Sequence, residues 1–285
     1  MPTIDLPQGT VHYRIAGPQE SALPPVVFVH GFLVNGALWD RTAAALAAAG
    51  VRSYAPDWPL GSHSQALRPG TDNSPRGVAR QIIAFVEALG LTDVTLVGND
   101  TGGALCQFVL DTDASRIGRL VLTNCDAFDQ FPPAPFDLLF KSFRKPRAIR
   151  PLLLPMRATA VRHSPAGFGT LAGSLDPAQT RAWIEPCLTD AAVREDVARF
   201  TNGIDPEELL DISTRLDQFA GPVTLVWGQR DRFFTPAHGR RLRDAFADAR
   251  LVELEGCRTF VPLDEPQRLA DEVVAIGDRS ALTHV

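Results

Sequence analysis

Residues 96–103, with the sequence Leu-Val-Gly-Asn-Asp-Thr-Gly-Gly, have the residue pattern with the clearest chemical meaning in the chain. They follow an apolar run typical of a buried strand, and they lead into a helical pattern. Gly98 and Gly102 permit a sharp strand-to-helix turn, which exposes the central side chain. That residue is Asp100, whose carboxylate can act as a nucleophile or as a general acid or base. The alternative interpretation is an aspartate that only caps the following helix.

The first half of the chain alternates strand and helix patterns. Helices are expected at 37–50 and 74–90, each ended by a glycine. Strands are expected at 10–17, 24–32, 51–57, 93–100 and 117–126. This alternation predicts an α/β fold, with a mostly parallel central sheet flanked by helices on both faces.

From about residue 127 the alternation stops, and helical patterns rich in proline and aromatic residues continue to about residue 216. Strand and helix patterns then resume, ending with a helix over 264–277. We therefore expect a core of residues 1–126 and 217–285, with a helical cap of residues 127–216 inserted after the sixth strand. An insertion at the carboxyl edge of a sheet would cover the usual ligand crevice.

The composition excludes several classes of function. A net charge of −5 over 285 residues argues against binding to nucleic acid, which needs a basic surface. No apolar run reaches the roughly 18 residues of a membrane span, and the N-terminus lacks a secretory pattern. The four cysteines are scattered, without the spacing of a disulfide or zinc framework. We expect a cytoplasmic enzyme without metal or cofactor, monomeric or homodimeric, that acts on a small molecule.

With aspartate at this turn, the chain resembles the branch of the α/β-hydrolase fold superfamily that contains haloalkane dehalogenases and epoxide hydrolases. His-Gly-Phe at residues 30–32 resembles the oxyanion loop of that family. The resemblance implies an oxyanion hole made by the backbone N–H groups of Phe32 and Thr101, which would stabilise charge on an ester of Asp100. For His30 we favour a structural role, in which the ring holds the loop through hydrogen bonds. Asn99 is a further supporting residue.

The resemblance also implies an acid that orients a catalytic histidine. Asp231 follows the first strand after the insertion, the usual position of this acid, and Asp126 follows the preceding strand, where some family members place it. Asp231 could instead be a turn residue or an ion-pair partner for Arg230 or Arg232. The histidine is expected at Thr259, in Gly-Cys-Arg-Thr-Phe, and it is absent.

In the family mechanism the carboxylate forms an alkyl ester, and the histidine then activates the water that hydrolyses it. Thr259 is no base near neutral pH, and loss of a positioned base removes about 10² to 10⁴ in rate. His63, in the loop after the strand over 51–57, is our candidate for a replacement base. The alternative is a solvated loop histidine. His163 could project into the cleft, whereas His238 is expected to face solvent, and His12 and His284 are remote from the site.

The markers of both subfamilies are missing. Similar dehalogenases have tryptophan directly after the nucleophile, where this chain has Thr101. Epoxide hydrolases use tyrosines of the cap to protonate the epoxide oxygen, but the only tyrosines here, Tyr13 and Tyr54, lie outside the insertion. Trp183 is expected to pack rather than to bind halide. Five phenylalanines could line an apolar pocket, although most are expected to pack inside the insertion: Phe128, Phe131, Phe136, Phe140 and Phe143. The arginines over 144–162 could recognise an acidic group or simply be solvated.

Three hypotheses follow from these residues. The first hypothesis is a hydrolase that uses Asp100 with an altered base, either His63 or a water held by Asp231. Alternatively, it is a non-hydrolytic enzyme, such as a lyase, isomerase or cyclase, with Asp100 as general acid or base. The third hypothesis is a binding protein in which the cleft persists without catalysis.

Overall fold

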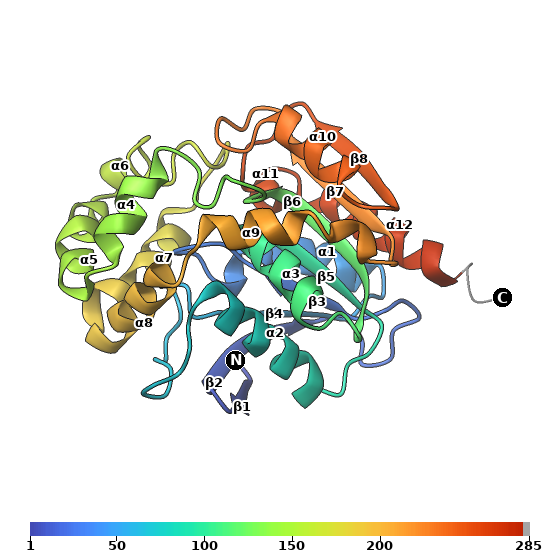
Figure 1. Ribbon diagram of the computed structural model, residues 1–285, viewed down its shortest axis with the longest axis horizontal. Coiled ribbons are helices and arrows are strands. Elements are labelled where there is room, and N and C mark those ends of the chain that lie inside the picture. The colour runs from blue at the N-terminus through green and yellow to red at the C-terminus, as the bar shows by residue number, and fades with distance from the viewer. Residues whose placement is uncertain (282–285) are drawn as a thin grey trace.

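The computed structural model describes residues 1–281, and its centre is one eight-stranded sheet (Figure 1). The strand order is β1-β2-β4-β3-β5-β6-β7-β8. Pairing is antiparallel from β1 to β2 and from β2 to β4, and parallel in all the other pairs. The strands are β1 (Thr3–Leu6), β2 (Gly9–Ala16), β3 (Val26–Val29), β4 (Ser53–Pro56), β5 (Val94–Asp100), β6 (Ile117–Cys125), β7 (Val223–Gly228) and β8 (Ala249–Leu254).

The predicted mostly parallel sheet is therefore confirmed. The central strands β3, β5 and β7 are buried and mostly apolar, because helices cover both of their faces. The edge strand β8 is only partly buried. Strand β1, which pairs with β2, was not predicted, because its four residues are too few to show a periodic pattern.

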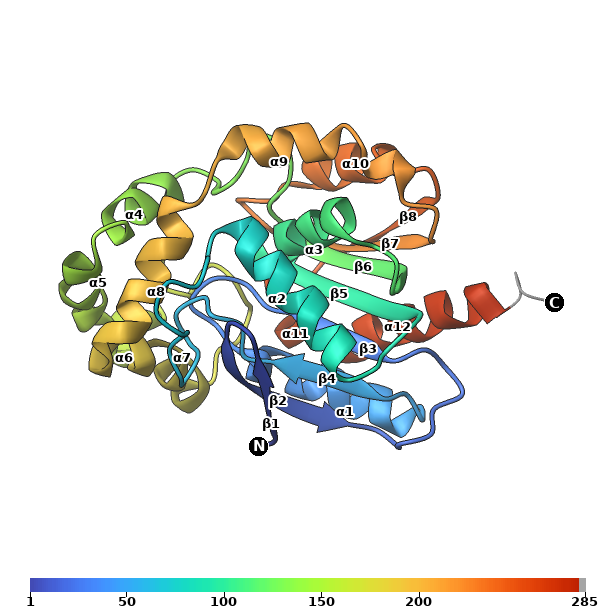
Figure 2. The same cartoon turned by 60° about the horizontal axis from the view of Figure 1, so that its bottom comes forward.

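Helices lie on both faces of the sheet, as Figure 2 shows. On one face α1 packs against α12, and on the other α2 packs against α3. The core helices are α1 (Asp40–Ala48), α2 (Pro75–Ala88), α3 (Thr101–Thr112), α10 (Pro236–Asp244), α11 (Val261–Asp264) and α12 (Pro266–Ala281), with short 3₁₀ helices η1 (Gly36–Trp39) and η3 (Leu216–Gln218). Within residues 1–281, no helix is both long and apolar enough to span a bilayer.

Between β6 and β7 the chain forms only helices. Besides η3, which directly precedes β7, they are α4 (Phe136–Phe143), α5 (Pro146–Leu153), η2 (Leu154–Arg157), α6 (Thr159–Arg162), α7 (Pro177–Thr189), α8 (Ala191–Asn202) and α9 (Pro206–Ser213). Helices α4 to α8 gather beyond one end of the sheet (Figures 1 and 2). Helix α9 instead returns to the core and packs against α3. We call α4 to α8 the roof helices.

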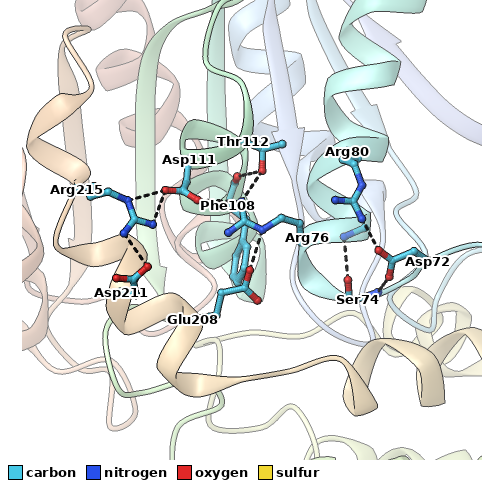
Figure 3. Close-up of polar contacts among 11 residues, drawn as sticks. Asp72, Ser74, Arg76, Arg80, Phe108, Asp111, Thr112, Glu208, Asp211 and Arg215 are labelled. Carbon is cyan, nitrogen blue, oxygen red and sulfur yellow. Dashed lines mark hydrogen bonds and ion pairs between the residues drawn. The ribbon is translucent and has the colours of Figure 1, made fainter.

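A group of charged residues fastens α9 to the core (Figure 3). Asp111 of α3 accepts hydrogen bonds from Arg76 of α2 at 2.9 Å and from Arg215 at 2.7 Å. Arg76 also donates to Glu208 of α9 at 2.8 Å, and Arg215 donates to Asp211 at 2.7 Å. Each carboxylate has a guanidinium partner, so the C-terminal end of the insertion is held on α2 and α3 by charge-assisted hydrogen bonds.

Candidate active site

The turn between β5 and α3 holds Asp100 in an unusual backbone conformation. Its φ is 55° and its ψ is −134°, a region that non-glycine residues rarely occupy. Gly102 lets the helix start lie against β3, because a Cβ there would lie 2.1 Å from the carbonyl oxygen of Val29. The Asp100 side chain makes no capping hydrogen bond to α3, so the helix-cap interpretation is wrong.

The Asp100 carboxylate instead points to the loop after β3. Its Oδ2 accepts a hydrogen bond from the backbone N–H of Phe32 at 3.2 Å. Gly31 permits this approach, since a Cβ at that position would lie 2.1 Å from Oδ2. The backbone N–H of Thr101 also favours the ionised carboxylate. The two donors expected for an oxyanion hole therefore both face Asp100.

Asp100 lines a cavity of about 320 Å³ under the roof helices. The walls are apolar side chains from the loop after β3, from α4 to α6 and from the segment before α7, together with Phe233 and Phe234 after β7. Polar side chains come only from Asp100, Thr101 and Asp126, and no Lys, Arg or His of residues 1–281 lines this space. In such surroundings a charge interacts strongly with its neighbours, because little water screens it.

Asp126, directly after β6, shares this cavity with Asp100. Its side chain is 1% exposed, and neither carboxyl oxygen has a partner with ordinary hydrogen-bond geometry among the described residues. Burial, reinforced by repulsion from Asp100, raises the pKa of Asp126 well above its ordinary value, although the Thr101 hydroxyl opposes this. The cavity therefore favours the protonated form of Asp126.

The pKa of Asp100 is also raised, to about 7. Burial is the main cause, the backbone N–H groups of Thr101 and Phe32 act in the opposite direction, and the charge of Asp231 adds to the rise. The cavity thus contains two acids whose protonated forms are favoured by burial, and the pKa of Asp100 lies close to neutral pH.

Asp231 and Thr259 lie behind the cavity wall rather than in it. Asp231 Oδ1 accepts from the backbone N–H groups of Phe233 at 2.8 Å and Phe234 at 3.1 Å. Burial raises the pKa of Asp231, and the Thr259 hydroxyl is among the neighbours that lower it. Asn99 donates to the Thr259 carbonyl at 2.7 Å and so joins the Asp100 turn to this loop.

Comparison with known proteins agrees with this geometry. A family model described as "Alpha/beta hydrolase family" matches residues 26–272. The chain belongs to the alpha/beta hydrolase family. It is 29% identical over 283 residues, 95% of this chain and 92% of the relative, to haloalkane dehalogenase 2 of Mycobacterium tuberculosis. It is 27% identical over 257 residues, 87% of this chain and 83% of the relative, to 2-hydroxy-6-oxononadienedioate/2-hydroxy-6-oxononatrienedioate hydrolase 1 of Dechloromonas aromatica.

Solved structures support the fold of this alpha/beta hydrolase. A putative ancestral haloalkane dehalogenase superimposes with a TM-score of 0.77 at 20% identity, covering 97% of this chain and 99% of the other. An alpha/beta hydrolase fold protein from Burkholderia ambifaria gives a TM-score of 0.78 at 22% identity, covering 96% and 97% of the two chains.

His63 does not lie where a base would be needed in this hydrolase. Its Nε2 lies 3.1 Å from Asp196 Oδ2 on α8, and its Nδ1 accepts from the backbone N–H of Gly61 at 3.3 Å. The ring is 3% exposed and does not line the cavity. Both nitrogens are already engaged in joining the loop to a roof helix. The prediction that His63 replaces the base is therefore contradicted, and so is the alternative of a solvated histidine.

His30 has the structural role that we expected. Its Nε2 accepts from the backbone N–H of Trp58 at 2.8 Å, and Nδ1 donates to the Gly31 carbonyl at 2.9 Å. Burial lowers the pKa of His30 to about 4, so the ring is neutral. These two bonds fix the loop that presents Phe32 to Asp100.

The other histidines of residues 1–281 also lie away from the cavity. His163 contacts the Thr180 hydroxyl at 2.9 Å. His238 was expected to face solvent, but it is 6% exposed, because α10 turns it toward the rings of Phe128 and Trp227. His284 lies outside the described residues.

The roof divides the expected aromatic residues between two roles. Phe136 and Phe140 line the cavity, whereas Phe128, Phe131 and Phe143 are buried in packing, as expected for most of this set. Trp183 packs edge-on against Phe168 and Phe260. None of the arginines over 144–162 lines the cavity.

Sequence reasoning missed several lining residues that show no local signal, among them Leu153, Met156 and Phe168. Phe233 and Phe234 could have been found, because two adjacent phenylalanines directly after the charged turn at residues 230–232 are unusual for a solvated loop.

Proposed function

We propose that this chain is a hydrolase for a small, uncharged organic electrophile, with Asp100 as the nucleophile and without a catalytic histidine. One observation carries the proposal: the Asp100 carboxylate lines an apolar cavity while its Oδ2 accepts from the Phe32 N–H. A side chain that served only the fold would not need a strained backbone to reach such a place.

In the first step, Asp100 attacks a substrate carbon, the leaving group departs, and an ester forms on the carboxyl group. In the second step, water adds to the carbonyl carbon of this ester. The backbone N–H groups of Phe32 and Thr101 then stabilise the negative oxygen of the tetrahedral intermediate, in a cavity where water does not weaken them.

The charge of the cavity supports an uncharged substrate. The Dechloromonas relative is named for a dicarboxylate, which would need cationic partners. The cavity in this chain has no such side chain among residues 1–281, and its acids would repel an anion. Its volume of about 320 Å³ fits a molecule of modest size.

Non-hydrolytic chemistry is the second candidate, and the pKa of Asp100 favours it. A carboxyl group with a pKa of about 7 is suited to moving a proton to and from a substrate near neutral pH. In that reaction no ester forms on the enzyme, so the two candidates differ in a measurable intermediate.

The test is intact-protein mass spectrometry after rapid quenching of reactions with small epoxides and alkyl halides. We expect an adduct located on Asp100 by peptide mapping, and no adduct in Asp100→Asn. Asp111→Asn is the matched control. It changes an acid in the last turn of α3, at the opposite end of the helix from Asp100, and should form the adduct normally. Turnover without any adduct, at all quench times, would support the second candidate instead.

A further inference from the structure

Asp126 lies beside Asp100 because their strands are neighbours in the sheet. Asp100 pairs in register with Cys125, the last residue of β6, so Asp126 emerges at the same edge one residue later. Both side chains line the cavity, and within residues 1–281 Thr101 is the only other residue that contributes a polar side chain to it.

Structural roles do not explain the Asp126 side chain. Both of its oxygens are buried, at 1% exposure of the residue, without a partner of ordinary hydrogen-bond geometry among residues 1–281. Leaving a buried polar group unpaired costs free energy, and an apolar residue would avoid that cost. An acid in this position would orient a histidine, but no histidine of the described chain lines the cavity. Asp126 is nevertheless one of the residues that line the cavity in which a substrate would bind.

We propose that Asp126 is the acid–base catalytic residue of this site, and that it acts directly on substrates whose leaving atom is oxygen. This inference rests on the proposed function, since it assigns a proton donor to the attack by Asp100. It also supplies the base that Thr259 cannot provide. One carboxyl group would serve first as the acid and then as the base.

The proton balance closes over one cycle. Asp100 attacks carbon, the carbon–oxygen bond breaks, and the departing oxygen takes the proton of Asp126; the products are an ester and an Asp126 carboxylate. Water then adds to the ester carbonyl and gives one proton to that carboxylate. When the tetrahedral intermediate collapses, the alcohol oxygen leaves with the proton of the newly formed carboxylic acid. Asp100 is again ionised and Asp126 is again protonated.

The electrostatics of the site fit this cycle. The charged or titratable groups that act on Asp126 are Asp100 and Asp231, both acids, and the buried thiol of Cys125 lies next to it. Burial, together with repulsion from these acids, raises the pKa of Asp126, which favours a proton on Asp126 when Asp100 attacks. A carboxylate with a raised pKa is also a stronger base when its turn comes.

Two probes of similar size separate this role from a structural one. Styrene oxide has an oxygen leaving group that needs a proton, whereas 2-phenylethyl bromide releases bromide, which needs none. Each probe is mixed with excess full-length enzyme at pH 8, where Asp100 is ionised, and its first-order consumption is followed. The enzymes compared are wild type, Asp126→Asn, Asp100→Asn and the control Asp111→Asn.

We expect Asp126→Asn to slow consumption of styrene oxide by about 10²-fold or more, the usual effect of a positioned acid. Consumption of the bromide should change by about threefold at most, because its departure requires no proton. The reaction with the bromide also reports whether the variant is folded and whether Asp100 still reacts. In the wild type the ester from the bromide should persist longer than the ester from the epoxide, since only the epoxide leaves Asp126 ionised.

Equal effects of Asp126→Asn on both probes, or no effect on either, would overturn the role of Asp126 while leaving Asp100 as nucleophile. Failure of the proposed function looks different. In that case wild type and Asp100→Asn would consume both probes at the same rate, and neither would carry an adduct.

Discussion

Two groups of acidic residues in this protein have opposite electrostatic surroundings. In the surface group (Figure 3), Asp111 lies between Arg76 and Arg215. These two arginines lower the pKa of Asp111 through hydrogen bonds and charge, despite an opposing contribution from burial. In the cavity group, Asp100 and Asp126 have no cationic partner in the cavity wall, and the pKa of both is raised.

The presence or absence of a cationic partner distinguishes the acids that stabilise the fold from those that we propose to be catalytic. Paired acids fasten α9 to the core through ion pairs with arginines. Unpaired acids in an apolar cavity weaken the fold when they ionise, and proteins retain such groups chiefly where a reaction needs them.

The largest effect on folding is expected from Asp100→Asn. The pKa of Asp100 is about 7 in the folded protein and 3.8 as its ordinary value, so the unfolded chain binds fewer protons between these pH values. Stability is therefore lost as the pH rises through this range, and the neutral amide removes that loss. We expect the variant to be more stable by about 2–4 kcal/mol at pH 8 and nearly unchanged at pH 4. Urea unfolding at both pH values measures this, and equal shifts at both would contradict the assignment.

A histidine introduced at position 259 should supply the base that is expected in this family but absent from this chain. Asp231 lies beside Thr259 and could orient the new ring. In the Asp126→Asn background we expect Thr259→His to speed hydrolysis of the bromide-derived ester by about 10- to 100-fold. Thr259 is fully buried, so the larger side chain should also cost about 1–3 kcal/mol of stability.

Loss of adduct mass with time measures this hydrolysis, and Thr259→Ala is the control for the loss of the hydroxyl. An ester that decays at the same rate in both variants, each with a cooperative melting transition, would mean that position 259 does not reach the site.

The pH dependence of ester formation reports the charge of Asp100 directly. Protonation removes the nucleophile, so consumption of 2-phenylethyl bromide should rise about tenfold per pH unit below the pKa of about 7 and level off above it. The relevant neighbours are Asp126, Asp231 and the Cys125 thiol, all without positive charge. A rate that is constant from pH 5 to pH 8 would show that Asp100 is ionised throughout and that the cavity does not raise its pKa.

The sequence predicted the sheet and the Asp100 turn because both follow local rules. Buried strands are continuous apolar runs, and glycines mark positions such as 102, where no Cβ fits. The place of Asp126 in the cavity follows from strand order, since β6 pairs with β5. What the sequence could not supply was the absence of a partner for its carboxyl group, which depends on every side chain around it.

The role of His63 was predicted wrongly for a related reason. Its predicted role rested on its place in a loop at the correct edge of the sheet. Asp196, which binds its Nε2, is 133 residues further along the chain, on α8. No local pattern announces such a contact, so the direction of the ring could not be predicted.

The smallest effect is expected from Asp111→Asn in the surface group. The substitution removes the negative charge that pairs with Arg76 and Arg215. Arg76 remains paired with Glu208, and Arg215 remains paired with Asp211. We expect the free energy of unfolding at pH 7 to fall by about 0.5–2 kcal/mol, less at high salt, with catalytic rates unchanged. Because these arginines lower the pKa of Asp111, its contribution is present at neutral pH and disappears in acid, as the carboxylate takes up a proton. Asp100→Asn should gain stability with rising pH relative to wild type while Asp111→Asn loses it, so urea unfolding of both variants from pH 3 to pH 8 would reveal the contrast as two curves of opposite slope.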